Sequence, residues 1–136
     1  LNAIAESAIN NLRVFCDDVN SVLKQSISND SLDRVNIYFP DPWPKKGHHK
    51  RRLIQPEFIN LLKNKLTKSG LLHIATDWQP YANWIYNIMC NNSKFQEISQ
   101  SEPQYYHYLR SRPETKFEHR GHKLGHTVSD LLFRAN

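Results

Sequence analysis

The chain has 136 residues, of which 39% are hydrophobic and 23% are charged, a balance typical of one soluble globular domain spanning residues 1–136. Its formal net charge of +5 favours a polyanionic partner. No apolar run approaches the ~20 residues that a membrane helix needs, and Glu6 and Asn10 interrupt the start of the chain. We therefore expect no signal peptide, no membrane contact and a cytoplasmic location.

Hydrophobic periodicity changes several times along the chain between about 2 and about 3.6 residues, which predicts strands and helices in turn. Residues 1–9 suit the end of a helix, and Asn11–Cys16 predicts a strand that ends at two acids. Val19–Ile27 predicts an amphipathic helix. Arg34–Phe39 predicts a second strand, and Pro40 ends it.

The next elements are a well-marked helix and a third strand. A helix is expected from Pro56, with Gly70 in the left-handed position that ends it. Leu71–Ala75 predicts a strand, and Thr76 or Asp77 is expected to cap the helix that follows.

Two further strands are predicted near the end of the chain, at Phe95–Ile98 and Leu124–Phe133, as an antiparallel pair. The long polar and aromatic loop between them, Glu102–Gly121, is more typical of a functional segment than of an idle one. The order of elements predicts an α/β fold with a mostly parallel sheet and an antiparallel C-terminal strand pair.

Acids follow all three strands that are expected to be parallel. They are Asp18, Asp41 and Asp77, and ligands of α/β sheets bind beyond the carboxyl ends of such strands. Asp41 lies between two prolines and precedes Trp43, whose ring could stack on a base. Each acid could instead cap a turn or a helix, and for Asp18 the two interpretations weigh equally.

A basic run from Lys45 to Arg52 carries five positive charges and contains no acid. Its charge of +5 equals the net charge of the whole chain. Charge runs are usually solvated surface, but acids normally alternate with the bases there. The sequence therefore predicts contacts with phosphates in this run and a steep dependence of binding on salt.

Cysteine and histidine add little to the functional prediction. Cys16 and Cys90 are too few and too far apart for a disulfide framework, and we expect both to be buried. His119, His122 and His126 have a spacing that metal ligands can take, but basic residues surround them and no acid accompanies them. We expect no metal site.

Four segments, taken together, resemble the tRNA (guanine-N7)-methyltransferase family in order and spacing. They are Phe39-Pro40-Asp41-Pro42-Trp43, the basic run ending Lys50-Arg51-Arg52, Ala75-Thr76-Asp77-Trp78, and Thr115-Lys116-Phe117-Glu118-x-Arg120-Gly121. The resemblance covers essentially the entire chain. It implies a Rossmann-like class I methyltransferase sheet, S-adenosylmethionine as cofactor, and methyl transfer to N7 of a guanine in the variable loop of tRNA.

The same resemblance implies roles for individual residues. Asp41 is the implied catalytic acid and also lies near the cofactor, and Asp18 is implied to lie near the cofactor adenine. The residues implied to contact the substrate are Lys45, Asp77, Thr115, Lys116, Phe117 and Glu118. The implied RNA-binding segment consists of Gly47, His48, His49, Lys50, Arg51 and Arg52, in which His48 and Arg51 fall on functional positions of the family. We expect a monomer or a homodimer.

The glycine-rich cofactor loop of the family has no counterpart in this chain, whose glycines are Gly47, Gly70, Gly121 and Gly125. We therefore expect the first two strands of the family fold to be absent from this chain, which would leave a gap in the sheet. Three functions remain open: a tRNA methyltransferase, a non-catalytic RNA-binding module derived from one, and a generic α/β domain with an incidental basic loop.

Methylation of guanine N7 needs no general base, because that nitrogen already has a lone pair. The reaction depends on aligning N7 with the methyl carbon and the sulfur. A carboxylate such as Asp41 could stabilise the positive charge that develops on the purine. Asp77 or Glu118 could accept hydrogen bonds from the guanine N1–H and amine, once the base has left its stack.

Overall fold

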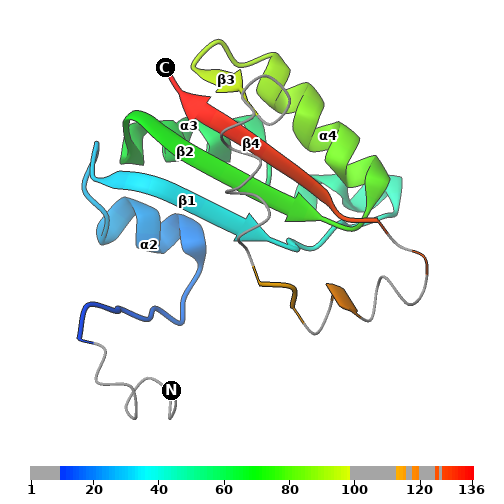
Figure 1. Cartoon of the computed structure of the whole chain (residues 1–136), viewed down its shortest axis with the longest axis horizontal. Coiled ribbons are helices and arrows are strands. Elements are labelled where there is room, and N and C mark those ends of the chain that lie inside the picture. The colour runs from blue at the N-terminus through cyan, green and yellow to red at the C-terminus, as the bar shows by residue number, and fades with distance from the viewer. Residues whose placement is uncertain (1–9, 99–112, 116–117, 120–124, 126) are drawn as a thin grey trace.

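The computed structural model describes residues 10–98, 113–115, 118–119, 125 and 127–136. In these residues four strands form one sheet with the order β1-β2-β4-β3 (Figure 1). The strands are β1 (Leu32–Tyr38), β2 (Leu66–Thr76), β3 (Phe95–Glu97) and β4 (Ser129–Ala135).

The sheet is mixed. Strands β1 and β2 pair in parallel, with Asn36 opposite His73. Strand β4 pairs antiparallel with β2 on one side and with β3 on the other, with Leu132 opposite His73 and Phe95 opposite Ala135. The predicted parallel pair and the predicted antiparallel C-terminal pair are both confirmed.

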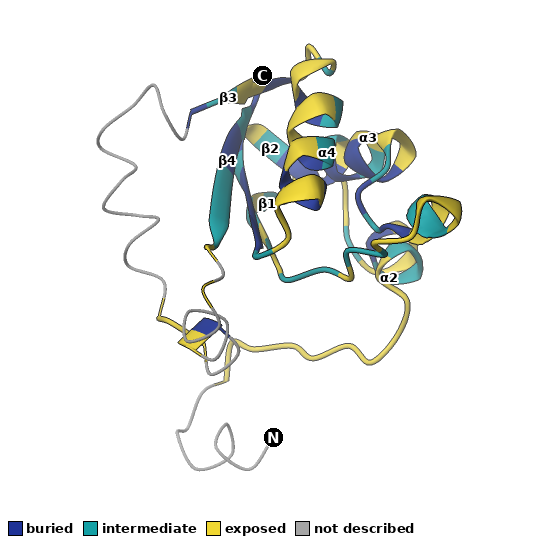
Figure 2. Ribbon diagram, turned by 90° about the vertical axis from the view of Figure 1, so that its right-hand side faces the viewer, coloured by how far each residue is buried: buried dark blue, intermediate teal, exposed yellow. Residues whose placement is uncertain are grey.

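Helices α2 (Val19–Gln25), α3 (Pro56–Lys65) and α4 (Gln79–Cys90) all lie on one side of the sheet (Figure 2). A short 3-10 helix, η1 (Lys46–Arg51), follows β1. The core lies between this helical layer and the sheet, because the apolar stripes of the helices pack on inward-facing strand residues. Its largest fully buried side chains include Ile54, Ile59, Leu62, Leu72, Ile74, Tyr81, Ile85 and Phe133.

Helix α4 begins one or two residues later than the sequence predicts. Its N-cap is Trp78, whose side chain makes no capping hydrogen bond, and Pro80 lies in the first turn. The prediction that Thr76 or Asp77 is the N-cap is therefore wrong. Thr76 instead accepts a hydrogen bond from the Trp78 amide at 3.3 Å through its hydroxyl.

The predicted strand at Asn11–Cys16 is not present, and this prediction is wrong. The segment has no regular secondary structure, and Leu12, Val14 and Phe15 are 47%, 63% and 53% exposed. A strand needs backbone partners on a neighbouring strand, and none of the four described strands lies beside this segment. Its apolar residues favour a strand, but no neighbouring strand among the described residues supplies hydrogen bonds to it. The described sheet therefore has two parallel strands rather than three.

Gly70 does not end a helix, contrary to the prediction. Helix α3 ends at Lys65, and Gly70 lies within β2, where Ser69 rather than the glycine has a positive φ of 65°. A Cβ atom on Gly70 would lie 2.9 Å from the Thr67 carbonyl oxygen and 3.2 Å from the Leu32 carbonyl oxygen. Glycine is needed here for space rather than for its conformational freedom.

Both cysteines are exposed and free, so the prediction that Cys16 and Cys90 are buried is wrong. Cys16 lies in the segment that forms no strand, and Cys90 is the last residue of α4. Within the described ranges, no helix is both long and apolar enough to cross a bilayer.

Candidate active site

The carboxyl ends of β1 and β2 open onto one cavity of about 560 Å³. Both strand-end acids from these two strands line it, as the parallel pairing requires. The lining residues are Tyr38, Phe39, Pro40, Asp41, Pro42, Asp77, Trp78 and Thr115. The sequence therefore identified two strand-end acids and one loop residue that the fold brings to a single cavity.

Asp41 lies on a tightly bent segment. Phe39 and Trp43, on either side of the Pro-Asp-Pro unit, have φ angles of 52° and 42°. Non-glycine residues rarely adopt this left-handed region, so the surrounding structure has to hold them there. One restraint is the Phe39 amide, which donates to the Ala75 carbonyl of β2 at 2.8 Å. The carboxylate of Asp41 itself is exposed.

Thr115 and Glu118 form a reciprocal capping box. The Thr115 amide donates to Glu118 Oε2 at 2.8 Å, and the Glu118 amide donates to Thr115 Oγ1 at 3.2 Å. Glu118 is buried, with 4% of its surface exposed. The Thr-x-x-Glu spacing is the signature of this motif, so the sequence itself carries the signal that could have predicted it. Lys116 and Phe117 lie outside the described residues.

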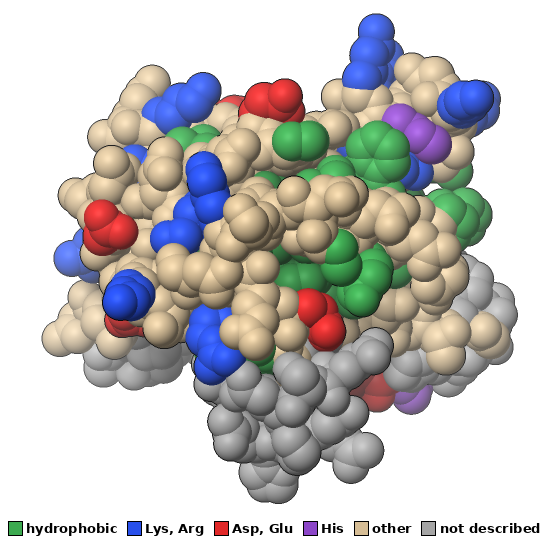
Figure 3. All heavy atoms as spheres, turned by 90° about the horizontal axis from the view of Figure 1, so that it is seen from above, with side chains coloured by type: hydrophobic (Ala, Val, Ile, Leu, Met, Phe, Trp, Pro, Cys, Tyr) green, Lys and Arg blue, Asp and Glu red, His purple; other side chains and the backbone are tan. Residues whose placement is uncertain are grey.

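The basic run forms η1, which follows the Asp41 segment. Lys45 is its N-cap residue, and the His48 amide donates to the Lys45 carbonyl at 2.8 Å. Lys45, Lys46, Gly47, Lys50 and Arg51 are exposed, and His48 and His49 are half-buried. In Figure 3, lysine and arginine side chains project beside a histidine at one corner of the molecule.

Trp43 lies among residues of η1. The Arg51 guanidinium is 5.1 Å from the centroid of the Trp43 ring, and the His48 ring meets it edge-on with centroids 5.9 Å apart. These contacts link the Asp41 segment to the exposed basic residues. An indole with a guanidinium beside it is a surface on which a base can stack.

Arg52 differs from its neighbours because it is buried, with 4% of its surface exposed. Its guanidinium lies 4.9 Å from the ring centroids of both Tyr81 and Trp84. Burial lowers the pKa of Arg52. The charge of an ionised Tyr81 phenolate has the smaller, opposite effect of raising that pKa. The predicted contact of Arg52 with RNA has less support from this placement than the contacts predicted for the exposed bases.

Asp18 lies apart from Asp41. Its carboxylate caps α2, accepting hydrogen bonds from the amides of Asn20 at 3.0 Å and Ser21 at 3.1 Å. It lines a separate cavity of about 420 Å³, together with Lys50 and Arg51. The two acids that were predicted to lie near one cofactor therefore do not share a cavity in the described residues.

A further cavity of about 570 Å³ lies between α3 and α4. Its lining contains four asparagines, a serine and the Trp84 ring, and no titratable side chain. It offers hydrogen bonds but neither a carboxylate nor a cation. The chemistry expected of this chain therefore points to the cavity at Asp41.

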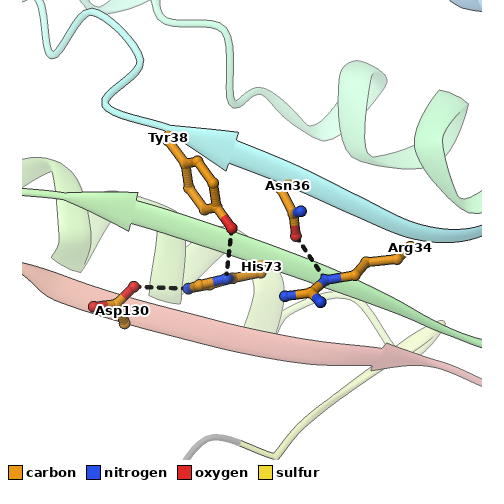
Figure 4. Close-up of polar contacts among 5 residues, drawn as sticks. All are labelled: Arg34, Asn36, Tyr38, His73 and Asp130. Carbon is orange, nitrogen blue, oxygen red and sulfur yellow. Dashed lines mark hydrogen bonds and ion pairs between the residues drawn. The ribbon is translucent and has the colours of Figure 1, made fainter. Parts of the chain in front are cut away.

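A chain of polar contacts that the sequence did not predict crosses three strands and is centred on a buried histidine (Figure 4). His73 of β2 is fully buried, its Nε2 is 2.7 Å from Asp130 Oδ1, and its Nδ1 is 3.3 Å from the Tyr38 hydroxyl. Because a carboxylate only accepts, the Nε2–H of His73 donates to Asp130, and Nδ1 lies within hydrogen-bond distance of the Tyr38 hydroxyl. Tyr38 lines the Asp41 cavity.

Of the three histidines considered as metal ligands, only His119 lies in the described part of the chain. Its Nδ1 is 4.0 Å from Glu114 Oε1. Within that part of the chain, no group of three or more His, Cys, Asp or Glu side chains could hold a metal ion.

Comparison with known proteins identifies the family. The family model described as "Putative methyltransferase" matches residues 1–131. The tRNA (guanine-N(7)-)-methyltransferase of Nitrosomonas europaea is 46% identical over 136 residues, covering 98% of this chain and 58% of the relative. Proteins of the same name from Methylobacillus flagellatus and Escherichia coli (strain UTI89) are 48% and 45% identical, each over 98% of this chain and 55% of the relative.

The chain spans between 55% and 58% of the length of these curated relatives. Its mixed sheet with helices agrees with the α/β, Rossmann-like methyltransferase fold that the resemblance implied. The match over nearly the entire chain confirms the resemblance carried by the four sequence segments. The chain belongs to the tRNA (guanine-N7)-methyltransferase family.

Proposed function

We propose that this chain carries the substrate-binding and acidic part of the active site of an S-adenosylmethionine-dependent tRNA (guanine-N7)-methyltransferase that acts on the variable loop. The observation that carries the proposal is the convergence of Asp41, Asp77 and Thr115 on one cavity of about 560 Å³ beside an exposed basic helix. An acid and a polyanion-binding surface in such proximity suit chemistry on a base within RNA.

Asp41 acts on the charge that the reaction creates. Alkylation of N7 leaves a positive charge on the purine, and a carboxylate fixed beside the ring stabilises that charge without accepting a proton. The left-handed residues on either side of the Pro-Asp-Pro unit support this role, because a carboxylate whose backbone is restrained needs little reorganisation during the reaction.

Asp77 recognises the guanine. Guanine presents two donors on one edge, N1–H and the exocyclic amine, and a carboxylate accepts from both. Asp77 lines the same cavity as Asp41, at the end of the neighbouring strand. Glu118 is the less direct candidate, since its side chain is buried and does not line this cavity. Thr115 also lines the cavity and offers its hydroxyl to the substrate.

The described residues fit one part of S-adenosylmethionine. Aromatic rings and a carboxylate both attract a sulfonium cation, and the Asp41 cavity has Tyr38, Phe39 and Trp78 in its wall. When bound, the cofactor supplies the methyl group. Asp41 and these rings would hold its charged end, and Asp18, which lines a separate cavity with Lys50 and Arg51, is the proposed contact for its adenine.

The exposed residues of η1 bind the tRNA backbone. Lys45, Lys46, Lys50 and Arg51 are the exposed cations of this segment, and His48 and His49 extend the surface at Trp43 and Trp84. Phosphate contacts of this kind position the RNA without reading its sequence. We further propose that the protein works in the cytoplasm, as a monomer or a homodimer.

The reaction can be tested on the substrate side. Labelled methyl transfer from S-adenosylmethionine would be measured with unmodified tRNA and with a matched tRNA that carries 7-deazaguanine at the variable-loop position. The analogue keeps the Watson–Crick edge but has no lone pair at position 7. We expect equal binding of the two RNAs and transfer to the first alone.

Other results would assign a different function. Equal methyl transfer to both RNAs would place the reaction at another atom and contradict the proposal. Salt-dependent binding of both RNAs without transfer or cofactor binding would instead favour the non-catalytic RNA-binding module.

A further inference from the structure

Arg52 is a buried cation in a run of exposed ones. The two residues before it, Lys50 and Arg51, are exposed, whereas Arg52 is 4% exposed. Among the described residues no carboxylate forms an ion pair with it. A buried charge needs compensation, so the contacts that Arg52 makes inside the protein indicate what it does.

Two kinds of contact surround the guanidinium. Its Nε donates to the Pro42 carbonyl at 2.9 Å. Its Cζ lies over two aromatic rings of α4, 4.9 Å from the centroid of Tyr81 and 4.9 Å from that of Trp84. Desolvated cation–π contacts are among the stronger of their kind, and here they take the place of an anion.

The two aromatic rings are themselves fixed by one residue. The Ile54 amide donates to the Tyr81 hydroxyl at 3.2 Å, and Trp84 Nε1 donates to the Ile54 carbonyl at 2.9 Å. Ile54 and Tyr81 are fully buried. The rings therefore form a rigid holder for the guanidinium, anchored in the hydrophobic core.

Arg52 and β2 restrain the Asp41 segment from opposite ends. At one end Phe39 donates to the Ala75 carbonyl of β2 at 2.8 Å, and at the other end Pro42 accepts from Arg52. Pro42 lies between Asp41 and Trp43, whose φ is 42°. Burial raises the pKa of Tyr81, and the negative charge of Asp41 raises it further. The Asp41 carboxylate therefore interacts electrostatically with one ring of the holder.

We propose that Arg52 is a positioning residue for Asp41, rather than a contact to an RNA phosphate: it ties the Pro42 carbonyl to the aromatic holder on α4 and so keeps the Pro-Asp-Pro turn in its reactive conformation. The functional part of this inference rests on the role proposed above for Asp41. Lysine cannot replace Arg52 in this role, because it has neither the planar group that contacts both rings nor the fixed Nε–H donor.

Salt dependence of tRNA binding separates the two roles, since it counts phosphate contacts. Arg51 is the matched control, because it is the adjacent residue, carries the same charge and is exposed. We expect Arg51→Gln to reduce the slope of log K against log salt by about one, as for one lost phosphate contact. Arg52→Gln should leave that slope unchanged, and an equal reduction in both variants would overturn the proposal.

Methyl transfer by Arg52→Lys provides the second readout. Lysine would still reach a phosphate, so a phosphate-binding role predicts nearly normal turnover. The positioning role predicts turnover at saturating tRNA at least tenfold below wild type, with the half-saturating tRNA concentration changed less than about threefold. Wild-type turnover in Arg52→Lys would overturn the proposal. A variant with a higher half-saturating tRNA concentration and unchanged turnover would overturn it as well.

The contact itself can be observed in the wild-type protein without any substrate. In a ¹H–¹⁵N spectrum, the Nε–H of Arg52 should be shifted by the ring currents of Tyr81 and Trp84 and should exchange slowly with water, and the Nε–H of Arg51 should exchange fast. An Arg52 signal that is unshifted and exchanges fast would overturn the proposal. A shifted, slowly exchanging Arg52 signal in a protein with no methyl transfer would count against the proposed function and not against the contact.

Discussion

The imidazole of His73 joins three strands through its two nitrogens. Tyr38 of β1 lies on one side of it and Asp130 of β4 on the other, and the ring is fully buried in β2 (Figure 4). The Tyr38 and His73 rings also meet edge-on, with centroids 5.2 Å apart. Because Tyr38 is the last residue of β1, this chain of contacts fixes the strand just before the Asp41 segment.

Removal of the Asp130 carboxylate should destabilise the protein. In Asp130→Ala, the buried Nε2–H of His73 loses its acceptor, and an unsatisfied buried donor costs about 1–3 kcal/mol. We expect the free energy of unfolding to fall toward the lower end of this range, because the Asp130 side chain is 26% exposed and water can replace it in part. Urea denaturation measures the change.

Asp130→Asn is the control for the same position. Its amide oxygen can still accept from His73, so we expect a loss of stability less than half that of Asp130→Ala. Equal free energies of unfolding for Asp130→Ala and Asp130→Asn would contradict this expectation.

For single residues, the sequence predicted those whose place in the fold follows from the strand directly before them. Asp41 and Asp77 were identified because each follows a strand, and the fold brings them to one cavity. The partners of His73 and the burial of Arg52 were not predictable in this way. The first depends on Asp130, 57 residues away, and the second on two rings of a later helix.

At the scale of single elements, α2 is a short helix of seven residues whose N-terminus depends on Asp18. Its carboxylate accepts from the Asn20 and Ser21 amides, and loss of such a cap costs about 1 kcal/mol. We expect Asp18→Ala to lower the free energy of unfolding by about that amount in urea denaturation.

A serine at the same position separates capping from cofactor binding. Asp18→Ser keeps an oxygen for capping but removes the charge, so stability should stay close to wild type. If Asp18 also binds S-adenosylmethionine, Asp18→Ser should weaken cofactor affinity in a calorimetric titration. Unchanged cofactor affinity together with unchanged stability would leave Asp18 with capping as its role.

Strand β2 requires glycine at position 70. A Cβ atom there would meet the Thr67 carbonyl oxygen at 2.9 Å, and backbone atoms cannot move aside easily. We expect Gly70→Ala to lower the free energy of unfolding by about 1–3 kcal/mol, the usual cost of overpacking. Gly47→Ala is the matched control, because nothing lies within 4 Å of its added methyl. Equal melting temperatures for the two variants would contradict this explanation.

Most elements were predictable because their periodicity agrees with their packing. Strand β1 and the start of helix α3 occur close to their predicted positions, since each element has an apolar face that the core covers. The segment Asn11–Cys16 shows where this reasoning fails. Its residues favour a strand, but propensity cannot form a strand without a neighbour to supply hydrogen bonds.

For the molecule as a whole, the parallel pairing of β1 and β2 is what builds the candidate site. It places two acids at one edge of the sheet, and η1 adds the exposed cations there. The sequence predicted this arrangement in outline. It did not predict that Asp18 would lie in a different cavity, because the position of that acid depended on a strand that is not present.

Asp41 is proposed to stabilise the positive charge that forms on the purine in the transfer step. The most direct test is single-turnover methyl transfer at saturating tRNA by Asp41→Asn, with Asp30→Asn as the control for removal of one negative charge. Asp30 is exposed, lies before β1 and has a φ of 50° that asparagine adopts readily. We predict a rate at least tenfold lower for Asp41→Asn, about 1.4 kcal/mol, and a rate within about twofold of wild type for Asp30→Asn. A wild-type rate in Asp41→Asn would contradict the account.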